Sequence, residues 1–69
     1  MELPIAPIDR LIRKAGAERV SDEAVKVLAG LLEDLAKQVT EAAVQYARHA
    51  KRKTITAEDI KLAAKAILG

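Results

Sequence analysis

The sequence predicts an all-α protein made of a short helix, a long central helix and a second short helix. Hydrophobic residues recur at spacings of three and four along most of the 69 residues, which is the period of an amphipathic helix. A β-branched Thr-Ile-Thr run at residues 54–56 separates the last two helical patterns. No linker or internal repeat divides the chain, so we expect a single domain over residues 1–69. Residues that break helices are confined to Pro4, Pro7, Gly16, Gly30 and Gly69.

The first helix is expected at residues 4–14. Proline is tolerated in the first turn of a helix, so Pro4 and Pro7 are compatible with a start at this point. Gly16 is expected to end the helix in a left-handed cap. Four aliphatic residues fall on one face of the helix and give it a core-facing side: Ile5, Ile8, Leu11 and Ile12.

The long central helix is expected at residues 21–50. The Ser21 hydroxyl can cap its free amides, and Asp22 and Glu23 complement the positive end of the helix dipole. A chain this short buries only about 60% of its unfolded surface, so we expect a second chain to cover part of this helix. Its apolar surface is wider than the seam of a two-stranded coiled coil and includes Val27, Leu28, Leu31, Leu32, Leu35, Ala36, Val39, Ala42, Ala43 and Tyr46.

The third helix is expected to begin after Thr56, because Thr56 and Asp59 have the spacing of a capping pair. Its apolar face is formed by Ile60, Ala63, Ala64 and Ile67. The most economical packing folds both short helices onto the long one and crosses two long helices from two chains. The sequence therefore predicts an obligate dimer.

Composition excludes several classes of protein. The 12 basic and 10 acidic residues give a net charge of only +2, so nucleic-acid binding has to be argued from where the cations lie. Without cysteine there are no disulfides or thiolate metal sites. No segment is a signal peptide or approaches the ~18 apolar residues of a membrane span, so we expect a cytoplasmic protein without a membrane partner. A single histidine and no convergent acid and base argue against an enzyme, a metal, a cofactor or a small-molecule substrate.

Three runs in this sequence resemble the archaeal histone family. They are Glu-Leu-Pro-Ile-Ala-Pro-Ile at residues 2–8, Ala-Gly-Ala-Glu-Arg-Val-Ser-Asp at residues 15–22, and Ala-Arg-His-Ala-Lys-Arg-Lys-Thr-Ile-Thr-Ala-Glu-Asp-Ile at residues 47–60. The resemblance implies the histone fold, a head-to-tail handshake homodimer, and the wrapping and compaction of double-stranded DNA without reading its sequence. It also implies a location on the chromosome or nucleoid. Composition and spacing alone lead only to a helical dimer with basic ends.

The resemblance also assigns DNA contacts. Arg19 matches the family's minor-groove arginine, and in the handshake it lies beside Lys53 and Thr54 of the other chain, which would bind phosphate. Arg10 and Arg13 would serve phosphates at the centre of the dimer. Each assignment has a plainer alternative: Arg19 as a loop charge paired with Glu18 or Asp22, and the other cations as ordinary solvated surface residues.

Two positions depart from the family's pattern and add positive charge beside the expected DNA path. Lys14 replaces a residue expected to be acidic, and Lys51 replaces a glycine. We expect both to strengthen DNA binding modestly. Arg52 and Asp59 match a structural ion pair of the family, so they are assigned to bracing the loop that follows the long helix and not to DNA.

Assembly beyond the dimer is a further expectation from the resemblance. The dimer–dimer contact would be formed by Tyr46, His49, Asp59 and Leu62, with Tyr46 standing where the family has leucine. His49 taken alone is equally consistent with a surface residue near a helix end. Contacts between successive layers of a wound filament would involve Gly16, Gly30, Asp34, Lys61 and Lys65.

Two functions from different classes remain open on the sequence. The first is an architectural DNA-packaging protein acting as a homodimer, or as a heterodimer with a paralogue. The second is a histone-fold scaffold that binds other proteins and has little contact with DNA. Arg10, Arg13, Arg19, Lys53 and Thr54 occur together in this chain, which favours the first, because a scaffold needs none of them.

Overall fold

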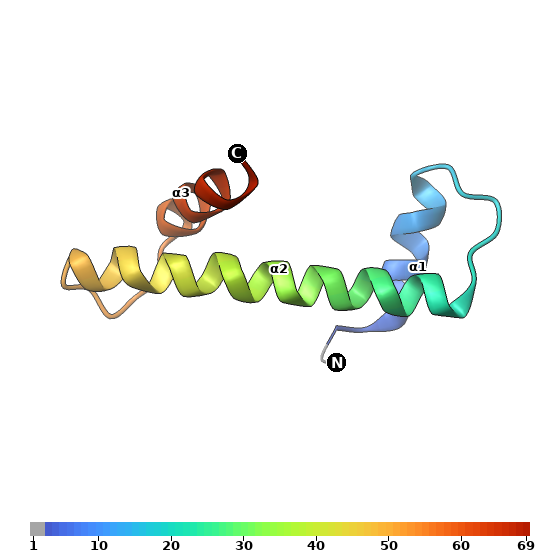
Figure 1. Ribbon diagram of the computed structural model, residues 1–69, viewed down its shortest axis with the longest axis horizontal. Coiled ribbons are helices and arrows are strands. Elements are labelled where there is room, and N and C mark those ends of the chain that lie inside the picture. Colours follow the sequence, from blue (N-terminus) through green and yellow to red (C-terminus); the bar gives the residue numbers. More distant parts are fainter. Residues whose placement is uncertain (1–2) are drawn as a thin grey trace. The chain divides into compact units, whose positions relative to one another are not determined.

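The computed structural model describes residues 3–69, and over this range the chain forms three helices and no strand (Figure 1). Helix α1 is Ile5–Lys14, α2 is Asp22–His49 and α3 is Ala57–Leu68. The predicted all-α class and the short–long–short order are confirmed, and each expected boundary lies within one residue of the observed one. Glu2, which opens the first family-like run, lies outside the described residues.

None of the helices in residues 3–69 has both the length and the hydrophobicity that a membrane span requires.

Helix α2 is a single helix of 28 residues, drawn in Figure 1 as an unbroken ribbon from teal-green to orange. The Ser21 hydroxyl oxygen accepts a hydrogen bond from the Ala24 amide at 3.0 Å, so the expected N-terminal cap is present. Asp22 and Glu23 occupy the first turn, where negative charge is favourable. At 1.5 Å per residue, α2 is about 42 Å long.

By their contacts the residues form two compact units, Met1–Asp34 and Leu35–Gly69, and α2 contributes one half to each. In the first unit, α1 packs on the N-terminal half of α2. Ile8, Val25 and Ala29 are buried there. The partly buried residues around them are Ile12, Val20, Leu28 and Leu32.

In the second unit, α3 packs on the C-terminal half of α2 around Val39, Ala43 and Ala63, which are all buried. The start of α3 is fixed by a capping box: the Thr56 hydroxyl accepts from the Asp59 amide at 3.3 Å, and the Asp59 carboxylate accepts from the Thr56 amide at 2.9 Å. The predicted capping pair is therefore confirmed. Around the core lie Leu35, Ala42, Tyr46 and Ala64.

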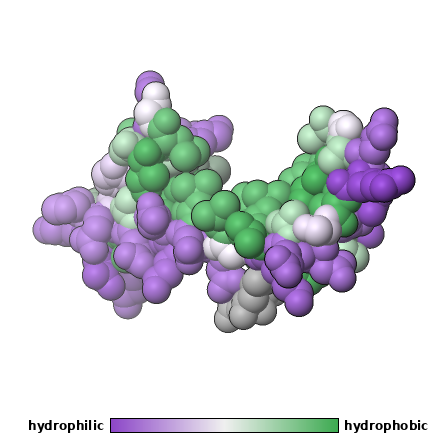
Figure 2. Space-filling view, turned by 45° about the vertical axis from the view of Figure 1, so that its right-hand side comes forward, coloured by the Kyte–Doolittle hydropathy of each residue, from purple (hydrophilic) through white to green (hydrophobic). Residues whose placement is uncertain are grey.

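Many large hydrophobic side chains are left uncovered in both units. Val27 and Leu31 on α2 are 63% and 61% exposed, although burying such a side chain is worth about 1.5–3 kcal/mol. Figure 2 shows this surface as open green areas beside the purple hydrophilic ones. Most buried hydrophobic positions on α2 are alanines, so little of its apolar surface is covered within one chain. The other exposed large hydrophobic residues are Ile5, Leu11, Ile55, Ile60, Leu62, Ile67 and Leu68.

Both interhelical loops begin with the same helix-ending motif. After α1, the Gly16 amide donates to the Arg13 carbonyl at 3.0 Å and the Ala17 amide donates to the Ile12 carbonyl at 3.4 Å. This pair of bonds is the Schellman motif, which requires a positive φ at its central residue. Gly16 has a φ of +116°, so the expected glycine cap is confirmed.

After α2, the equivalent bonds run from the Lys51 amide to the Arg48 carbonyl at 2.9 Å and from the Arg52 amide to the Ala47 carbonyl at 2.8 Å. The central residue is Lys51, with a φ of +58°. A residue with a Cβ atom pays about 1–2 kcal/mol for this conformation, whereas glycine adopts it freely. The glycine expected at this position would therefore suit the backbone better than lysine does.

Replacing Lys51 by glycine is predicted to raise the free energy of unfolding by about 1 kcal/mol, because the strain of the left-handed conformation is removed. The measurement is urea denaturation followed by circular dichroism at a fixed protein concentration. Lys51→Ala is the matched control, since it removes the charge and keeps the Cβ atom, and its stability should stay close to wild type. Equal stabilisation by both substitutions would mean that the charge, and not the backbone, is responsible.

Candidate nucleic-acid interface

The second loop, residues 50–56, carries three successive cations, Lys51, Arg52 and Lys53, followed by Thr54. All four are exposed. The loop leaves α2 through the left-handed turn at Lys51 and enters α3 through the capping box at Thr56. Because both ends are fixed by hydrogen bonds, the cations are carried on a loop of defined conformation.

The Arg52 guanidinium is committed to contacts within the protein. Its Nη1 and Nη2 atoms donate to the two carboxylate oxygens of Asp59 at 2.8 and 2.9 Å, a bidentate ion pair. Nη1 also donates to the carbonyl oxygen of Thr54 at 3.0 Å. Arg52 thus ties the middle of the second loop to the first turn of α3, which is the bracing position expected from the sequence.

Asp59 is the buried charged residue of the described chain, with 5% of its surface exposed. The hydrogen bonds from the Arg52 side chain, and then the one from the Thr56 amide, hold the pKa of its carboxyl group well below the usual 3.8, against the opposing effect of burial. The carboxylate is therefore ionised whenever the protein is folded near neutral pH. Both carboxylate oxygens of Asp59 already accept hydrogen bonds from Arg52 or Thr56 of the second loop. Any contact of Asp59 between dimers would be made in addition to these.

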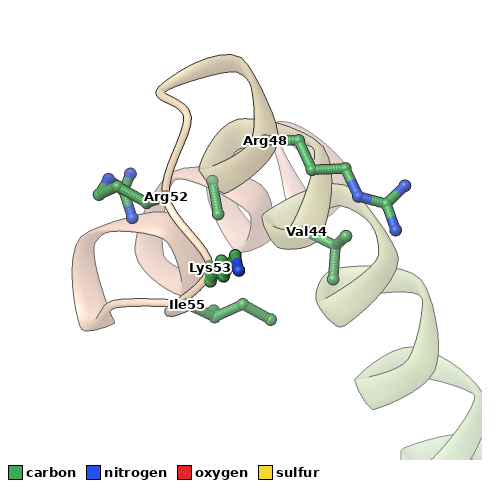
Figure 3. Close-up of a pocket in the computed structure, with 6 residues that line it drawn as sticks. Val44, Arg48, Arg52, Lys53 and Ile55 are labelled. Carbon is green, nitrogen blue, oxygen red and sulfur yellow. The ribbon is translucent and has the colours of Figure 1, made fainter.

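A pocket of about 290 Å³ lies under the second loop (Figure 3). Its apolar lining comes from Val44, Ala47 and Ile55, and in Figure 3 the Val44 and Ile55 side chains face each other with Lys53 beside them. Arg48 and Arg52 extend away from it in opposite directions. The loop therefore has a basic outer side and an uncovered apolar side.

The first loop, residues 15–21, and α1 carry the other expected DNA contacts. Arg10, Lys14 and Arg19 are exposed, and within residues 3–69 none of them forms an ion pair or a side-chain hydrogen bond. The alternative pairing of Arg19 with Glu18 or Asp22 is therefore not found. These cations are available to an external anion.

Arg13 differs from the other cations of this unit. Its Nε atom donates to the Asp9 carboxylate at 3.0 Å, and its Nη1 atom donates to the Glu18 carbonyl oxygen at 3.4 Å. Sequence reasoning assigned Arg13 to phosphate and missed this pair. The signal was present, because a carboxylate and an arginine four residues apart on a helix are neighbours.

The residues expected at contacts between dimers are accessible to different degrees. Tyr46 is half-buried, His49 is exposed and Leu62 is 54% exposed. Leu62 also lines a second pocket, of about 310 Å³, together with two residues expected at layer contacts. The full lining of that pocket is Glu58, Asp59, Lys61, Leu62 and Lys65.

The two glycines expected at layer contacts have different local explanations. Gly16 is required by its positive φ, independently of any assembly. Gly30 is within α2, and an added Cβ would meet nothing within 4 Å, so packing inside the chain gives no reason for a glycine that costs about 1 kcal/mol relative to alanine. Lys61 has a long ion pair with Glu58 at 3.7 Å, and Lys65 and Asp34 are exposed without one in the described part of the chain.

No group of three or more histidine, cysteine or carboxylate side chains in residues 3–69 is arranged to hold a metal ion.

Comparison with known proteins identifies the family. Residues 1–64 match the family model for histone-like transcription factors (CBF/NF-Y) and archaeal histones. The chain is 66% identical over 65 residues to one of the subunits of archaeal histone HAN1 from Thermococcus zilligii, covering 94% of this chain and 97% of that one. It is 50% identical over 62 residues to probable archaeal histone 3 of Methanocaldococcus jannaschii, covering 90% and 92% of the two chains. This chain therefore belongs to the archaeal histone family.

A more distant relative is DNA-binding protein HmvA of Methanocaldococcus jannaschii, which is 44% identical over 59 residues. The match covers 86% of this chain and 62% of that protein.

The Asp59 site predicts a specific dependence of stability on pH. Since the folded pKa of Asp59 is lowered, its contribution to stability is fully present above the ordinary value of 3.8 and is lost as the pH falls toward the lowered folded value. Urea midpoints should therefore fall on acidification from about pH 5 to about pH 2. Asp59→Asn should lower the midpoint at neutral pH, and the gap to wild type should narrow in acid. If the difference in urea midpoint between wild type and Asp59→Asn stayed the same from neutral to acidic pH, this account would be contradicted.

Proposed function

We propose that the protein binds, wraps and compacts double-stranded DNA without reading its sequence, as an architectural protein of chromatin. Membership of the archaeal histone family supports this proposal. The observation that carries it in this chain is the set of exposed cations without a partner in the described residues: Arg10, Lys14, Arg19, Lys51 and Lys53.

The chemistry of such an interface is electrostatic. Each phosphate neutralised by lysine or arginine releases condensed counterions, so affinity falls steeply as salt rises. Lys53 supplies an ammonium group and Thr54 a hydroxyl, and contacts of this kind position a duplex without specifying its sequence. Arg19, which has no partner among the described residues of its own chain, is suited to enter the minor groove, where a narrow groove concentrates negative potential. A relative named as a DNA-binding protein adds support.

The DNA-binding unit is proposed to be a handshake homodimer in which residues 1–69 form one domain completed by the second chain. The exposed Val27 and Leu31 on α2 support this, since most of their surface is left uncovered by the described residues. The apolar pocket formed by Val44, Ala47 and Ile55 supports contact at the second loop. In that arrangement the first loop of one chain lies beside the second loop of the other, which brings Arg19 near Lys53. A paralogue of the same family is the alternative second chain.

Association beyond the dimer is proposed to use Tyr46, His49, Asp59 and Leu62 between dimers. Contacts between layers are proposed to use Gly16, Gly30, Asp34, Lys61 and Lys65. Gly30 is the strongest support, because a Cβ atom added there would meet nothing within 4 Å among the described residues, so packing there does not call for a glycine. Leu62, Lys61 and Lys65 line one pocket, so the two kinds of contact would share a surface on α3.

The scaffold alternative is not favoured, because a protein that only binds other proteins has no use for this set of free cations. Catalysis is not part of the proposed function, in line with a family of DNA-packaging proteins. Where the protein acts follows from the same proposal: it would be associated with the chromosome or nucleoid inside the cell.

Band-shift or anisotropy titrations with unrelated duplexes are predicted to give similar affinities that fall steeply with salt. Arg19→Ala should weaken binding and loosen wrapping while leaving helix content unchanged. Glu23→Gln, at a position outside the proposed contacts, is a control for changes in charge. Binding that is absent or insensitive to salt would reject the packaging function, and unfolding of Arg19→Ala would mean that Arg19 is structural.

Sedimentation of the free protein is predicted to give a dimer, because the uncovered face of α2 cannot remain in water. A folded monomer at low concentration would refute the handshake proposal. On DNA, nuclease digestion should give a ladder of protected fragments. Gly30→Ala should raise the stability of the free protein by about 1 kcal/mol and shorten that ladder. A ladder unchanged by Gly30→Ala would remove Gly30 from the layer contacts.

A further inference from the structure

The two interhelical loops are held by the same kind of contact. In each, one arginine pairs with a carboxylate outside the loop and also donates to a backbone carbonyl within it. In the second loop the arginine is Arg52, with Asp59 and the Thr54 carbonyl. In the first loop it is Arg13, with Asp9 and the Glu18 carbonyl.

The Arg13 contacts reach the residue next to Arg19. Nε binds Asp9 at 3.0 Å, which fixes the guanidinium on the side of α1, and Nη1 reaches the Glu18 carbonyl at 3.4 Å. Arg19 follows Glu18 directly in the sequence. Arg13 is therefore placed to restrain the backbone on which the proposed minor-groove side chain is carried.

The same contacts make Arg13 a poor phosphate ligand. Its charge is partly neutralised by Asp9, and a phosphate would have to compete with that carboxylate. Arg10, on the same helix, is exposed and has no such partner in the described chain. The two arginines expected at the central phosphates therefore have different environments, although the sequence pattern treats them alike.

We propose that Arg13 is a positioning residue, which together with Asp9 holds the first loop in the conformation that presents Arg19 to DNA. The proposal rests on the DNA-binding function proposed above. Fixing a loop before binding reduces the conformational entropy that is lost on complex formation, so affinity increases without a new contact to the ligand.

The expected effect is modest. The side chains of Arg13 and Asp9 are 50% and 34% exposed, and exposed pairs contribute little because water and salt screen them. A pair of this kind corresponds to about a two- to fivefold change in affinity. The direction of this change in affinity and its dependence on salt concentration distinguish a positioning residue from a direct phosphate ligand.

The first test needs no DNA, so it examines the contacts of Arg13 with Asp9 and Glu18, called the brace below, separately from the proposed function. In ¹⁵N relaxation measurements on the free dimer, Arg13→Lys and Asp9→Asn should lower the order parameters of the Glu18 and Arg19 amides. Arg10→Lys is the matched control and should leave them unchanged. If the Glu18 and Arg19 amides of all three variants had the same order parameters as in the wild-type protein, with unchanged helix content, the proposal would be overturned.

The second test measures affinity for a fluorescent duplex at several salt concentrations. Arg13→Lys keeps the charge, so a direct phosphate ligand would tolerate it; the brace predicts about two- to fivefold weaker binding with an unchanged salt slope. Arg10→Ala, by contrast, should lower the slope by about 0.9 for each phosphate that the protein no longer neutralises. Arg13→Lys binding as tightly as wild type would overturn the proposal.

The role of Asp9 gives the sharpest contrast. If Asp9 only masks Arg13, then Asp9→Asn should strengthen binding at least as much as Glu18→Gln, which removes a nearby negative charge outside the brace. If Asp9 holds the brace, Asp9→Asn should bind about two- to fivefold more weakly than Glu18→Gln. If the wild-type protein does not bind DNA at all, the proposed function is wrong. The relaxation measurement would still show whether Arg13 and Asp9 restrain the backbone of the first loop.

Discussion

The structure depends on one constraint, which is that α2 has more apolar surface than α1 and α3 cover. Each short helix packs on one half of α2 and buries mainly alanines and a few aliphatic residues. Val27 and Leu31 remain in water in the single chain. A second chain would cover such side chains and gain the free energy of burying them. The proposed DNA interface depends on this pairing, because it would bring the first loop of one chain beside the second loop of the other.

The loops show how charge and backbone conformation compete. Both leave their helix through a Schellman motif, and both are tied to a neighbouring helix by an arginine and a carboxylate. The first loop places Gly16 at the left-handed position, whereas the second places Lys51 there. A lysine that accepts backbone strain beside Arg52 and Lys53 is consistent with a loop in which positive charge matters more than stability.

The helices could be predicted closely because their signals are local. Ser21 caps α2, Thr56 and Asp59 form the capping box of α3, and Gly16 ends α1 in a positive-φ turn, each as the sequence pattern indicated. These contacts link residues no more than a few positions apart. The roles of Arg19 and Lys53 could not be derived in this way, and they came from the resemblance to archaeal histones, because free surface cations have no distinctive spacing.

The sequence by itself therefore determined the helices, their caps, the excess of apolar surface and the family, since periodicity, capping and long matching runs are properties of neighbouring residues. Only the tertiary structure decided which cations are free. It showed that Arg13 also reaches the Glu18 carbonyl, that Arg52 also reaches the Thr54 carbonyl, and that Arg19 has no ion pair or side-chain hydrogen bond within the described residues. The physical reason is that an ion pair depends on where a side chain ends in space, and backbone turns such as the one at Lys51 set that position.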